Sequence, residues 1–290
     1  MLAGCASSTS SPPGTTVSRP TLSVSSASPT RPASVSSSTA KPIPPTAAQR
    51  RARAAKQLAA VVADQPAGAV SVAALNTETG AEFFGGATSG MWTASVYKLF
   101  VLETLMLRGP LSSSEQSRAT TMIENSDNVA GYSLFLAAGG RPALVSAARR
   151  FGMANTVPGY SDPTLTRTSG HDCLALLRNL VAPGPLSKAQ RVFALDLMRS
   201  VERDQRWGVG VVADKGSSFA NKNGWLSIDD NGPGESDDGL WAVTSLGVVA
   251  LGGDQVLMAV LTRHQPDFDT GVRLVERLAR IVAPTVRAAS

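Results

Sequence analysis

The sequence predicts a mixed α/β (α+β) fold in which an antiparallel five-stranded sheet has flanking helices and a central all-helical lobe. Strand-like segments form two groups, a hairpin at 69–84 and three strands between 219 and 262. A block of helical segments separates the two groups, and a further helical segment lies at each end. Strands from both ends of the chain can pair in one sheet, with the terminal helices on one of its faces and the central block as a second lobe. A cleft between the lobes is the natural place for a site.

Each element follows from local patterns. Leu58, Val61 and Val62 at helical spacing predict a helix from about Ala47 to Asp64. Apolar, β-branched residues predict strands, and turn residues at 76–80 join the first two. The expected strands are 69–75, 81–84, 219–226, 240–251 and 255–262. A helix that follows residues 91–95 is expected to end near residue 108. The other expected helices are 112–125, 129–138, 142–151, 171–181, 188–201 and 270–281. Residues 154–170 have no clear period and predict a long ordered loop.

Charge and composition divide the chain. The net charge is +5, but seven bases precede the first acid, Asp64, so that residues 64–290 carry 20 bases and 22 acids. The basic excess therefore lies in the tail, which argues against a nucleic-acid-binding domain. Residues 1–48, almost wholly Ser, Thr, Pro and Ala after residue 5, predict a disordered tether, and residues 49–290 predict the folded domain.

The first residues indicate where the protein acts. Leu2-Ala3-Gly4-Cys5 resembles a bacterial lipobox, although no charged and apolar segments precede it. We expect a lipid on Cys5 and an exported protein, either anchored at the outer face of the cell membrane or secreted. The alternative is an ordinary cysteine near a disordered terminus.

The sequence gives little support for a zinc protein, a disulfide-rich protein or a membrane-spanning protein. Two cysteines and two histidines nearly exclude a zinc site and a disulfide framework. No run of about 18 apolar residues predicts a transmembrane helix. We expect neither a cofactor nor a metal, and a monomer with a small-molecule substrate.

Ser95 and Lys98 form a Ser-x-x-Lys pattern at the start of a predicted helix. One helical turn separates them, so their side chains can face each other. Serine becomes a good nucleophile when a base takes its proton, and a lysine can act as that base when burial or positive charge lowers its pKa. The pattern alone also fits a helix start with a surface lysine.

Two more triplets have unusual composition for their places in the chain. Ser126-Asp127-Asn128 lies between two predicted helices, where capping explains one such residue but not three. Lys222-Asn223-Gly224 lies in a predicted strand, although lysine and glycine are poor strand formers. A ligand laid against the strand explains both, and a bulge on an edge strand is the alternative.

Together the three motifs resemble those of penicillin-recognising serine enzymes, most closely class A β-lactamases and their lipoprotein relatives in actinobacteria. The resemblance covers about residues 50–285 and implies a β-lactamase/transpeptidase-like fold. It implies that Ser95 is the acylated nucleophile, Lys98 its base and Ser126 a proton relay. Asn128 would contact the substrate's side-chain amide, and Lys222 its carboxylate, within a substrate site that also includes Asn223, Gly224 and Trp225. Backbone N–H groups of Ser95 and Trp225 would form the oxyanion hole.

The sequence departs from that family in the loop that supplies the deacylating base. Asp162-Pro163-Thr164-Leu165-Thr166 stands where the family has Glu-Pro-x-Leu-Asn. Asp162 is one methylene shorter than Glu, so a base there would sit farther from the water, and a misplacement of about 1 Å can cost on the order of a hundredfold in rate. The alternative interpretation is that Asp162-Pro163 forms only a turn and has no role in catalysis. The loop also reaches Thr168-Ser169 sooner than in the family, so it is shortened. The segment between Ser95 and Ser126 is roughly half the family's length, which implies that a wall of the pocket is missing.

Three other patterns are weaker. Arg206 is a candidate for the family's carboxylate-binding arginine. His171-Asp172 suggests a Ser-His-Asp triad, but the Ser-x-x-Lys mechanism needs no histidine. The acid-rich segment 228–238 suggests calcium, but its Gly and Pro content favours a solvated hairpin loop.

The sequence therefore predicts an exported serine hydrolase that forms an acyl-enzyme with β-lactams, with weak deacylation. One alternative is a D-Ala-D-Ala carboxypeptidase or amidase acting on peptidoglycan. The other is a non-catalytic cell-envelope lipoprotein that binds a cell-wall ligand. The first reading would connect the chain to antibiotic resistance.

Overall fold

The computed structural model describes residues 44–228 and 239–287. Cys5, most of the predicted tether and the acid-rich segment 229–238 lie outside the described residues. The compact unit begins at Pro44, and its first helix, α1 (Ala47–Ala63), starts two residues before the predicted domain boundary. Thr46 caps this helix by accepting from the backbone N–H of Gln49.

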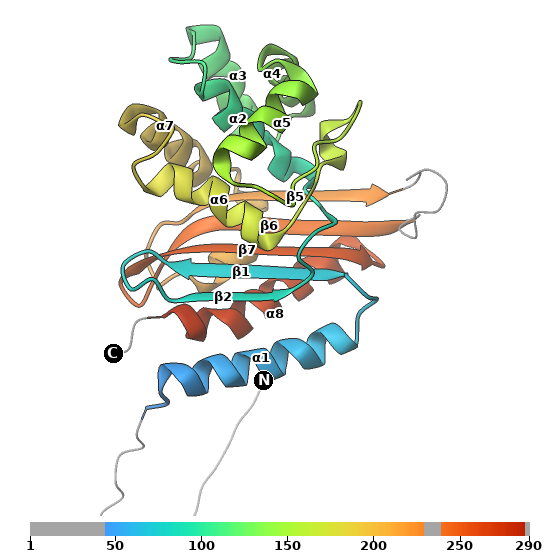
Figure 1. Cartoon of the computed structure of the whole chain (residues 1–290), viewed down its shortest axis with the longest axis vertical. Coiled ribbons are helices and arrows are strands. Elements are labelled where there is room, and N and C mark those ends of the chain that lie inside the picture. Colours follow the sequence, from blue (N-terminus) through green and yellow to red (C-terminus); the bar gives the residue numbers. More distant parts are fainter. Residues whose placement is uncertain (1–43, 229–238, 288–290) are drawn as a thin grey trace, which may run out of the picture. The chain divides into compact units, whose positions relative to one another are not determined.

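The central layer is the predicted antiparallel five-stranded sheet, which is confirmed (Figure 1). Its strand order is β2-β1-β7-β6-β5. β1 and β7, from opposite ends of the chain, pair in the middle, with Ala73 opposite Ala259. β5 is an edge strand and carries the Lys-Asn-Gly triplet. The strands are β1 (Val70–Asn76), β2 (Glu82–Gly86), β5 (Ala220–Ile228), β6 (Leu240–Leu251) and β7 (Asp254–Gln265).

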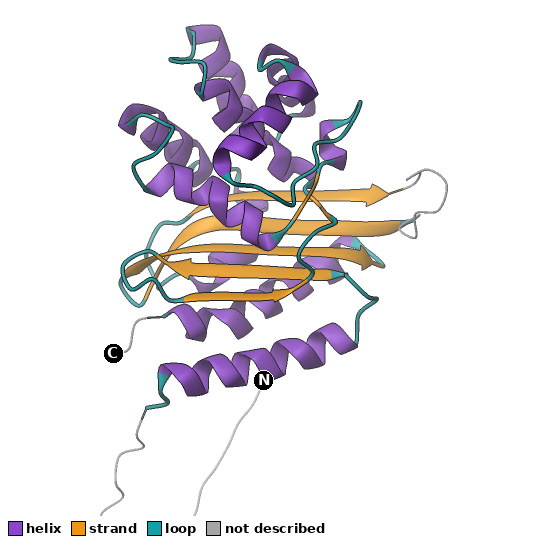
Figure 2. Ribbon diagram, viewed as in Figure 1, coloured by secondary structure: helices purple, strands orange, loops and turns teal. Residues whose placement is uncertain are grey.

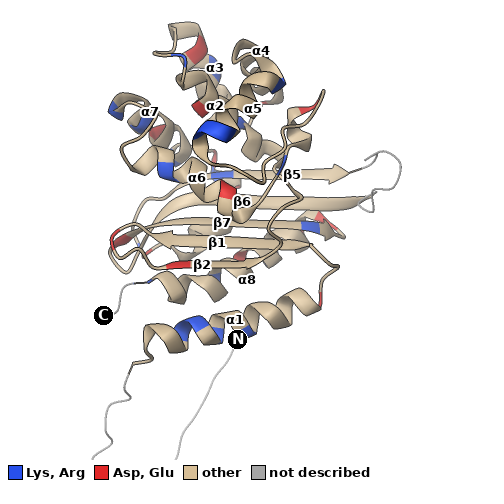
Figure 3. Cartoon of the chain, viewed as in Figure 1, with Lys and Arg blue, Asp and Glu red and all other residues tan. Residues whose placement is uncertain are grey.

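One face of the sheet is covered by the two terminal helices, α1 and α8 (Phe268–Val286) (Figure 1). Ala54, Leu58 and Val61 of α1 are buried, as the helical spacing predicts. Figure 3 shows Lys and Arg positions along α1, and Arg51, Arg53 and Lys56 of this helix are exposed. The amphipathic pattern thus places the helix against the protein without burying its charges.

The other face carries the helical lobe (Figure 2). All ten residues of its first helix, α2, are buried, including the charged residues Lys98 and Glu103, which fits a mainly apolar helix without a polar stripe. α6 packs on the sheet, α3, α4 and α5 pack against α2, and α7 packs against α3, α6 and β5. The lobe contains α2 (Tyr97–Met106), α3 (Ser113–Glu124), α4 (Asn128–Ala137), α5 (Gly140–Phe151), α6 (Gly170–Val181) and α7 (Lys188–Arg199).

The long loop predicted at 154–170 contains more regular structure than expected. β3 (Met91–Trp92) pairs with β4 (Arg167–Thr168), and a 3₁₀ helix, η2 (Pro163–Leu165), precedes β4. The backbone N–H of Thr93 also donates to Thr166 O at 2.9 Å. These two-residue strands are too short to produce a periodic pattern, yet they fasten the loop to the segment that leads into Ser95. Two further 3₁₀ helices, η3 (Arg203–Gln205) and η4 (Gly208–Val212), precede β5.

Candidate active site

Ser95 lies at the junction between the sheet and the helical lobe. It is the middle residue of a 3₁₀ helix, η1 (Ala94–Val96), which continues directly into α2. Ala94 has a φ of 42°, a left-handed conformation that is strained for alanine. The side chain of Ser95 is half-buried, so its hydroxyl can be reached from solvent while the helix behind it is rigidly packed.

The side chain of Lys98 lies against Ser95, as the Ser-x-x-Lys spacing predicts. Its Nζ is 2.9 Å from Ser95 Oγ and also donates to Ser126 O at 2.6 Å and Asn128 Oδ1 at 2.7 Å. The residue has no exposed surface. Burial lowers the pKa of the Lys98 ammonium from its ordinary 10.5 to about 8, and the Asp127 carboxylate opposes part of that shift. At pH 7 about a tenth of this amine is therefore uncharged, far more than for an ordinary lysine.

Ser126 and Asn128 reach Lys98 because the chain turns sharply between α3 and α4. Ser126 has a φ of 56°, a left-handed conformation, and both its carbonyl and its hydroxyl face Lys98 Nζ. Asp127 accepts from the backbone N–H of Ala130 and so caps α4. The triplet thus combines one capping residue with two residues that point into the site.

Lys222 of β5 approaches the same hydroxyl from the sheet. Its Nζ donates to Ser126 Oγ at 2.8 Å and to its neighbour's carbonyl, Asn223 O, at 3.0 Å. Burial, and after it the charge of Lys98, holds the pKa of the Lys222 ammonium well below its usual range. The residue is 0% exposed, and its side-chain contact with another side chain is with Ser126.

Gly224 allows β5 to lie directly against the backbone that carries Ser95. A Cβ at this position would come within 2.6 Å of Thr93 O and 2.8 Å of Ser95 N. Only glycine fits such an approach. The peptide that joins Gly224 to Trp225 therefore lies beside the Ser95 amide, which is the juxtaposition that the expected oxyanion hole requires.

The side chains of Asn223 and Trp225 face away from Lys222, because successive residues of a strand alternate between faces. Asn223 is 1% exposed, and its amide donates to the carbonyls of Gln205 and Trp207. Trp225 packs against Trp207 and Phe268 on the side of the terminal helices. The two side chains thus support the edge strand from behind, and the expected role of Trp225 in the oxyanion hole concerns its backbone N–H alone.

Asp162 does not join the hydrogen-bonded cluster. Its carboxylate is exposed and accepts from Thr164 N at 2.8 Å and Thr164 Oγ1 at 2.7 Å, so that it caps η2. Thr166, which stands where the family has its water-holding Asn, is buried, and its hydroxyl accepts from Gly159 N and donates to Pro163 O. The hydrogen bonds of both residues thus correspond to a capped turn.

Two other candidates are occupied elsewhere. Arg206 donates to Arg199 O at 2.7 Å, and its guanidinium lies 4.4 Å from the ring centroid of Phe219. The His171 ring stacks on Phe84, with Nδ1 3.6 Å from Asp172 Oδ1, on α6. Neither has a described contact with the cluster around Ser95.

Sequence reasoning missed Gly131, which lies one turn into α4. A Cβ there would come within 2.5 Å of the Tyr97 hydroxyl and 3.0 Å of Lys98 Cε. This glycine therefore gives the lysine its space. A glycine inside a predicted helix, three residues after Ser-Asp-Asn, is the signal that could have identified it.

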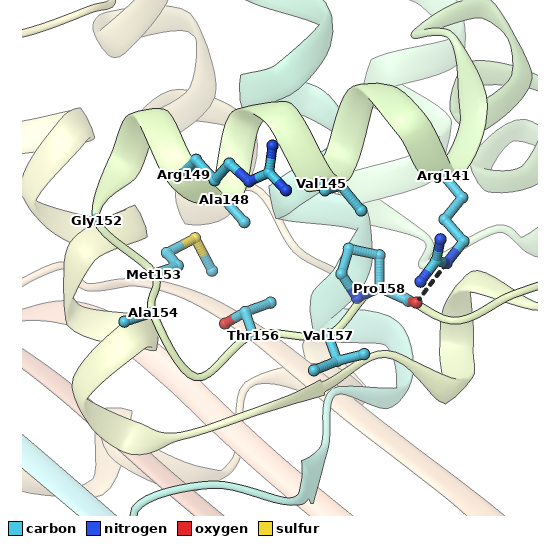
Figure 4. A pocket seen from close by; sticks show the side chains of 10 residues that line it. All are labelled: Arg141, Val145, Ala148, Arg149, Gly152, Met153, Ala154, Thr156, Val157 and Pro158. Carbon is cyan, nitrogen blue, oxygen red and sulfur yellow. Dashed lines mark hydrogen bonds between the residues drawn. The ribbon is translucent and has the colours of Figure 1, made fainter.

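A cavity of about 490 Å³ lies elsewhere, between α5 and the chain that follows it (Figure 4). Figure 4 shows Arg141 and Arg149 on one side and Met153 and Pro158 on the other. None of the predicted site residues lines it. The candidate site is therefore identified by its hydrogen bonds and not by its volume.

No described segment supplies an obvious metal site or a membrane span. Among residues 44–228 and 239–287, no group of three His, Cys, Asp or Glu side chains is placed to hold a metal ion. Nor does this part of the chain contain a helix that is long and apolar enough to cross a bilayer. The chemistry that the cluster can support is nucleophilic catalysis by a serine beside a partly uncharged lysine, with a second hydroxyl in reach to carry a proton.

Comparisons with known proteins found a family model and relatives that match much of the chain. A family model described as "Beta-lactamase enzyme family" matches residues 110–286, which include Ser126 and Lys222 but begin after Ser95 and Lys98. The protein named "Putative lipoprotein LppW" of Mycobacterium tuberculosis is 28% identical over 235 residues, 75% of this chain and 70% of that protein.

Solved structures share the fold. A mutant of PBP-A in an acyl-enzyme complex with penicillin G has a TM-score of 0.67 and 21% identity, covering 80% of this chain and 95% of that one. A class A β-lactamase from Mycobacterium abscessus has a TM-score of 0.64 and 20% identity, covering 79% of this chain and 97% of that one.

Proposed function

We infer the function from the family to which the chain belongs, the beta-lactamase enzyme family. We propose that the protein is an exported serine hydrolase whose Ser95 forms an acyl-enzyme with β-lactams, and that this acyl-enzyme is hydrolysed slowly. One observation carries the proposal: Lys98 Nζ lies 2.9 Å from Ser95 Oγ, and the pKa of that amine is lowered to about 8. A weak nucleophile and a base of suitable strength are thus already in contact.

The acylation step uses groups of the described cluster. The uncharged amine of Lys98 takes the proton of the Ser95 hydroxyl while Ser95 Oγ bonds to the β-lactam carbonyl carbon. The ring C–N bond then breaks, and the leaving nitrogen receives a proton through Ser126, whose hydroxyl lies within 3.2 Å of Lys98 Nζ. Backbone N–H groups beside Gly224 would stabilise the oxyanion. Deacylation adds one water and returns the free serine.

Slow deacylation is proposed from the contacts of the loop. A general base must reach the proton that it abstracts directly or through one water. The Asp162 carboxylate is instead engaged by Thr164, and the Thr166 hydroxyl holds its own loop. We therefore expect acylation to be faster than release.

Export and membrane anchoring belong to the same proposal. Its support is the lipobox-like Leu2-Ala3-Gly4-Cys5, the polar tether that follows and the lipoprotein name of the mycobacterial relative. A domain on such a tether would act outside the cell membrane.

A time course of the intact protein's mass in excess penicillin G, followed by removal of free drug, tests the proposal. We expect one penicillin per chain and a bound form that persists for many minutes. An adduct that vanishes within seconds would indicate an efficient β-lactamase. Absence of any adduct would contradict the proposal and favour a non-catalytic protein that binds a cell-wall ligand.

The engaged Asp162 also favours a second candidate, a D-Ala-D-Ala carboxypeptidase or amidase acting on peptidoglycan. Such an enzyme need not hydrolyse a penicilloyl ester quickly. Release of D-Ala from a synthetic stem peptide, at a rate that exceeds penicillin turnover and is lost in Ser95→Ala, would support it.

A further inference from the structure

Helix α4 exposes apolar side chains beside the candidate site. Val129, Tyr132 and Leu136 are 80%, 47% and 57% exposed, and they are three of the eight large hydrophobic residues exposed in the described part of the chain. None of the ten residues of α4 is charged. Single exposed apolar residues need no explanation, but several on one short helix indicate a contact surface.

Tyr132 and Leu136 lie on the same face of α4 as the site residue Asn128. Asn128, the first residue of α4, accepts from Lys98 Nζ at 2.7 Å, so its side chain points into the site. Tyr132 and Leu136 follow it at intervals of four, which places all three on one face of the helix. At about 1.5 Å per residue, they lie about 6 and 12 Å beyond Asn128 along the helix axis.

The rest of α4 explains why this face remains uncovered. Ala130, Gly131, Leu134 and Phe135 are its buried residues, and the helix contacts α2, α3 and α5. The Tyr132 ring lies 5.9 Å from that of Phe135, so it is supported from below while its outer side stays open. The face from Asn128 to Leu136 is thus a rigid, uncharged extension of the site.

We propose that Tyr132 and Leu136 bind an apolar substituent on the acyl side of the substrate, so that the enzyme prefers substrates with long, uncharged acyl groups. The inference rests on the proposed function. Continuity with Asn128 argues for this occupant, because the group that reaches Asn128 must continue across the open face if it is long. A cationic or anionic substituent would find no partner on α4.

Two penicillins that share one nucleus test the inference, one with an acetyl and one with a biphenylacetyl side chain. The readout is the ratio of their second-order acylation rate constants, followed by intact mass. We expect the wild-type chain to favour the long side chain by about tenfold, and the double variant Tyr132→Ser, Leu136→Ser to bring the ratio near one. Val192→Ser, at a 48% exposed position on α7, is the matched control and should keep the wild-type ratio.

The outcomes separate the inference from its premise. Acylation by both probes with the same ratio in the wild type and the double variant overturns the inference and leaves the proposed function intact. Acylation by neither probe overturns both. A wild-type dimer in sedimentation that the double variant abolishes would assign the face to a second copy of the chain and would also overturn the inference. Circular dichroism of the double variant establishes that it is folded.

Discussion

Lys98 and Lys222 direct their side-chain nitrogens at one oxygen, the hydroxyl of Ser126, at 3.2 and 2.8 Å. Neither residue has exposed surface. Two buried ammonium groups this close would repel each other, and burial penalises each charge further. Burial lowers the pKa of Lys98, although the Asp127 carboxylate opposes part of that shift, and burial followed by the charge of Lys98 lowers the pKa of Lys222. The site thus increases the uncharged fraction of the amine that a base for Ser95 requires.

The acylation rate should rise with pH up to about 8 and then level off. Because burial lowers the pKa of Lys98 to about 8, the uncharged fraction grows as pH approaches that value, by about fiftyfold from pH 6 to pH 8. Stopped-flow acylation by a fluorescent penicillin between pH 5.5 and 9.5 measures the profile, with the uncatalysed hydrolysis subtracted. A flat profile would show that Lys98 does not act as the base.

Lys222→Met should slow acylation for anionic and neutral substrates alike. The buried amine acts on Ser126 Oγ, so its loss removes a hydrogen bond worth about 1–3 kcal/mol, or about five- to 150-fold in rate. The comparison uses a penicillin and its methyl ester. If only the anionic substrate loses rate, Lys222 acts on the substrate carboxylate, as the family resemblance implies.

Gly224→Ala should disable the site. The added Cβ would lie 2.6 Å from Thr93 O and 2.8 Å from Ser95 N, and backbone atoms cannot yield as side chains do. A displacement of about 1 Å at Ser95 costs on the order of a hundredfold in acylation rate. Gly184→Ala, where the nearest atom is 4.0 Å away, is the control. Normal acylation by the Gly224→Ala protein would exclude the close approach of β5.

Asp162→Ala should lower stability by about 1 kcal/mol, because η2 loses its cap. Its penicillin adduct should last as long as that of the wild type. Asp162→Asn keeps an oxygen for Thr164 and should retain both properties. A tenfold longer adduct lifetime in the Asn variant would instead identify Asp162 as the deacylating base. Chemical denaturation and intact mass provide the two measurements.

Most of the fold could be predicted because its elements are long enough to show a period. The spacing of Leu58 and Val61 and the β-branched run at β1 indicated the correct elements, with ends displaced by one or two residues for most of them. The β3–β4 pair escaped prediction, since two-residue strands carry no pattern. The contact between Thr93 and Thr166 is likewise a tertiary property that no local pattern contains.

For the site, spacing predicted which side chains meet but not which way each one faces. Ser95 and Lys98 are one turn apart, so their contact was expected. Asn223 and Trp225 were placed in the substrate site with Lys222, and strand alternation turns their side chains to the opposite face. The expected role of the Trp225 backbone N–H does not depend on that orientation. The Asp162 carboxylate accepts a hydrogen bond from the Thr164 hydroxyl. The sequence left two interpretations of Asp162-Pro163 open, a deacylating base or only a turn, because this contact depends on how the loop folds.

Mapping the penicillin adduct tests the central claim most directly. The wild-type chain, Ser95→Ala and Ser133→Ala are treated with penicillin G, digested and sequenced by mass spectrometry. We expect a single penicilloyl group on Ser95 in the wild-type and Ser133→Ala proteins, and none in Ser95→Ala. An adduct of equal yield on the Ser95→Ala protein, or one located on another residue of the wild type, would contradict that claim.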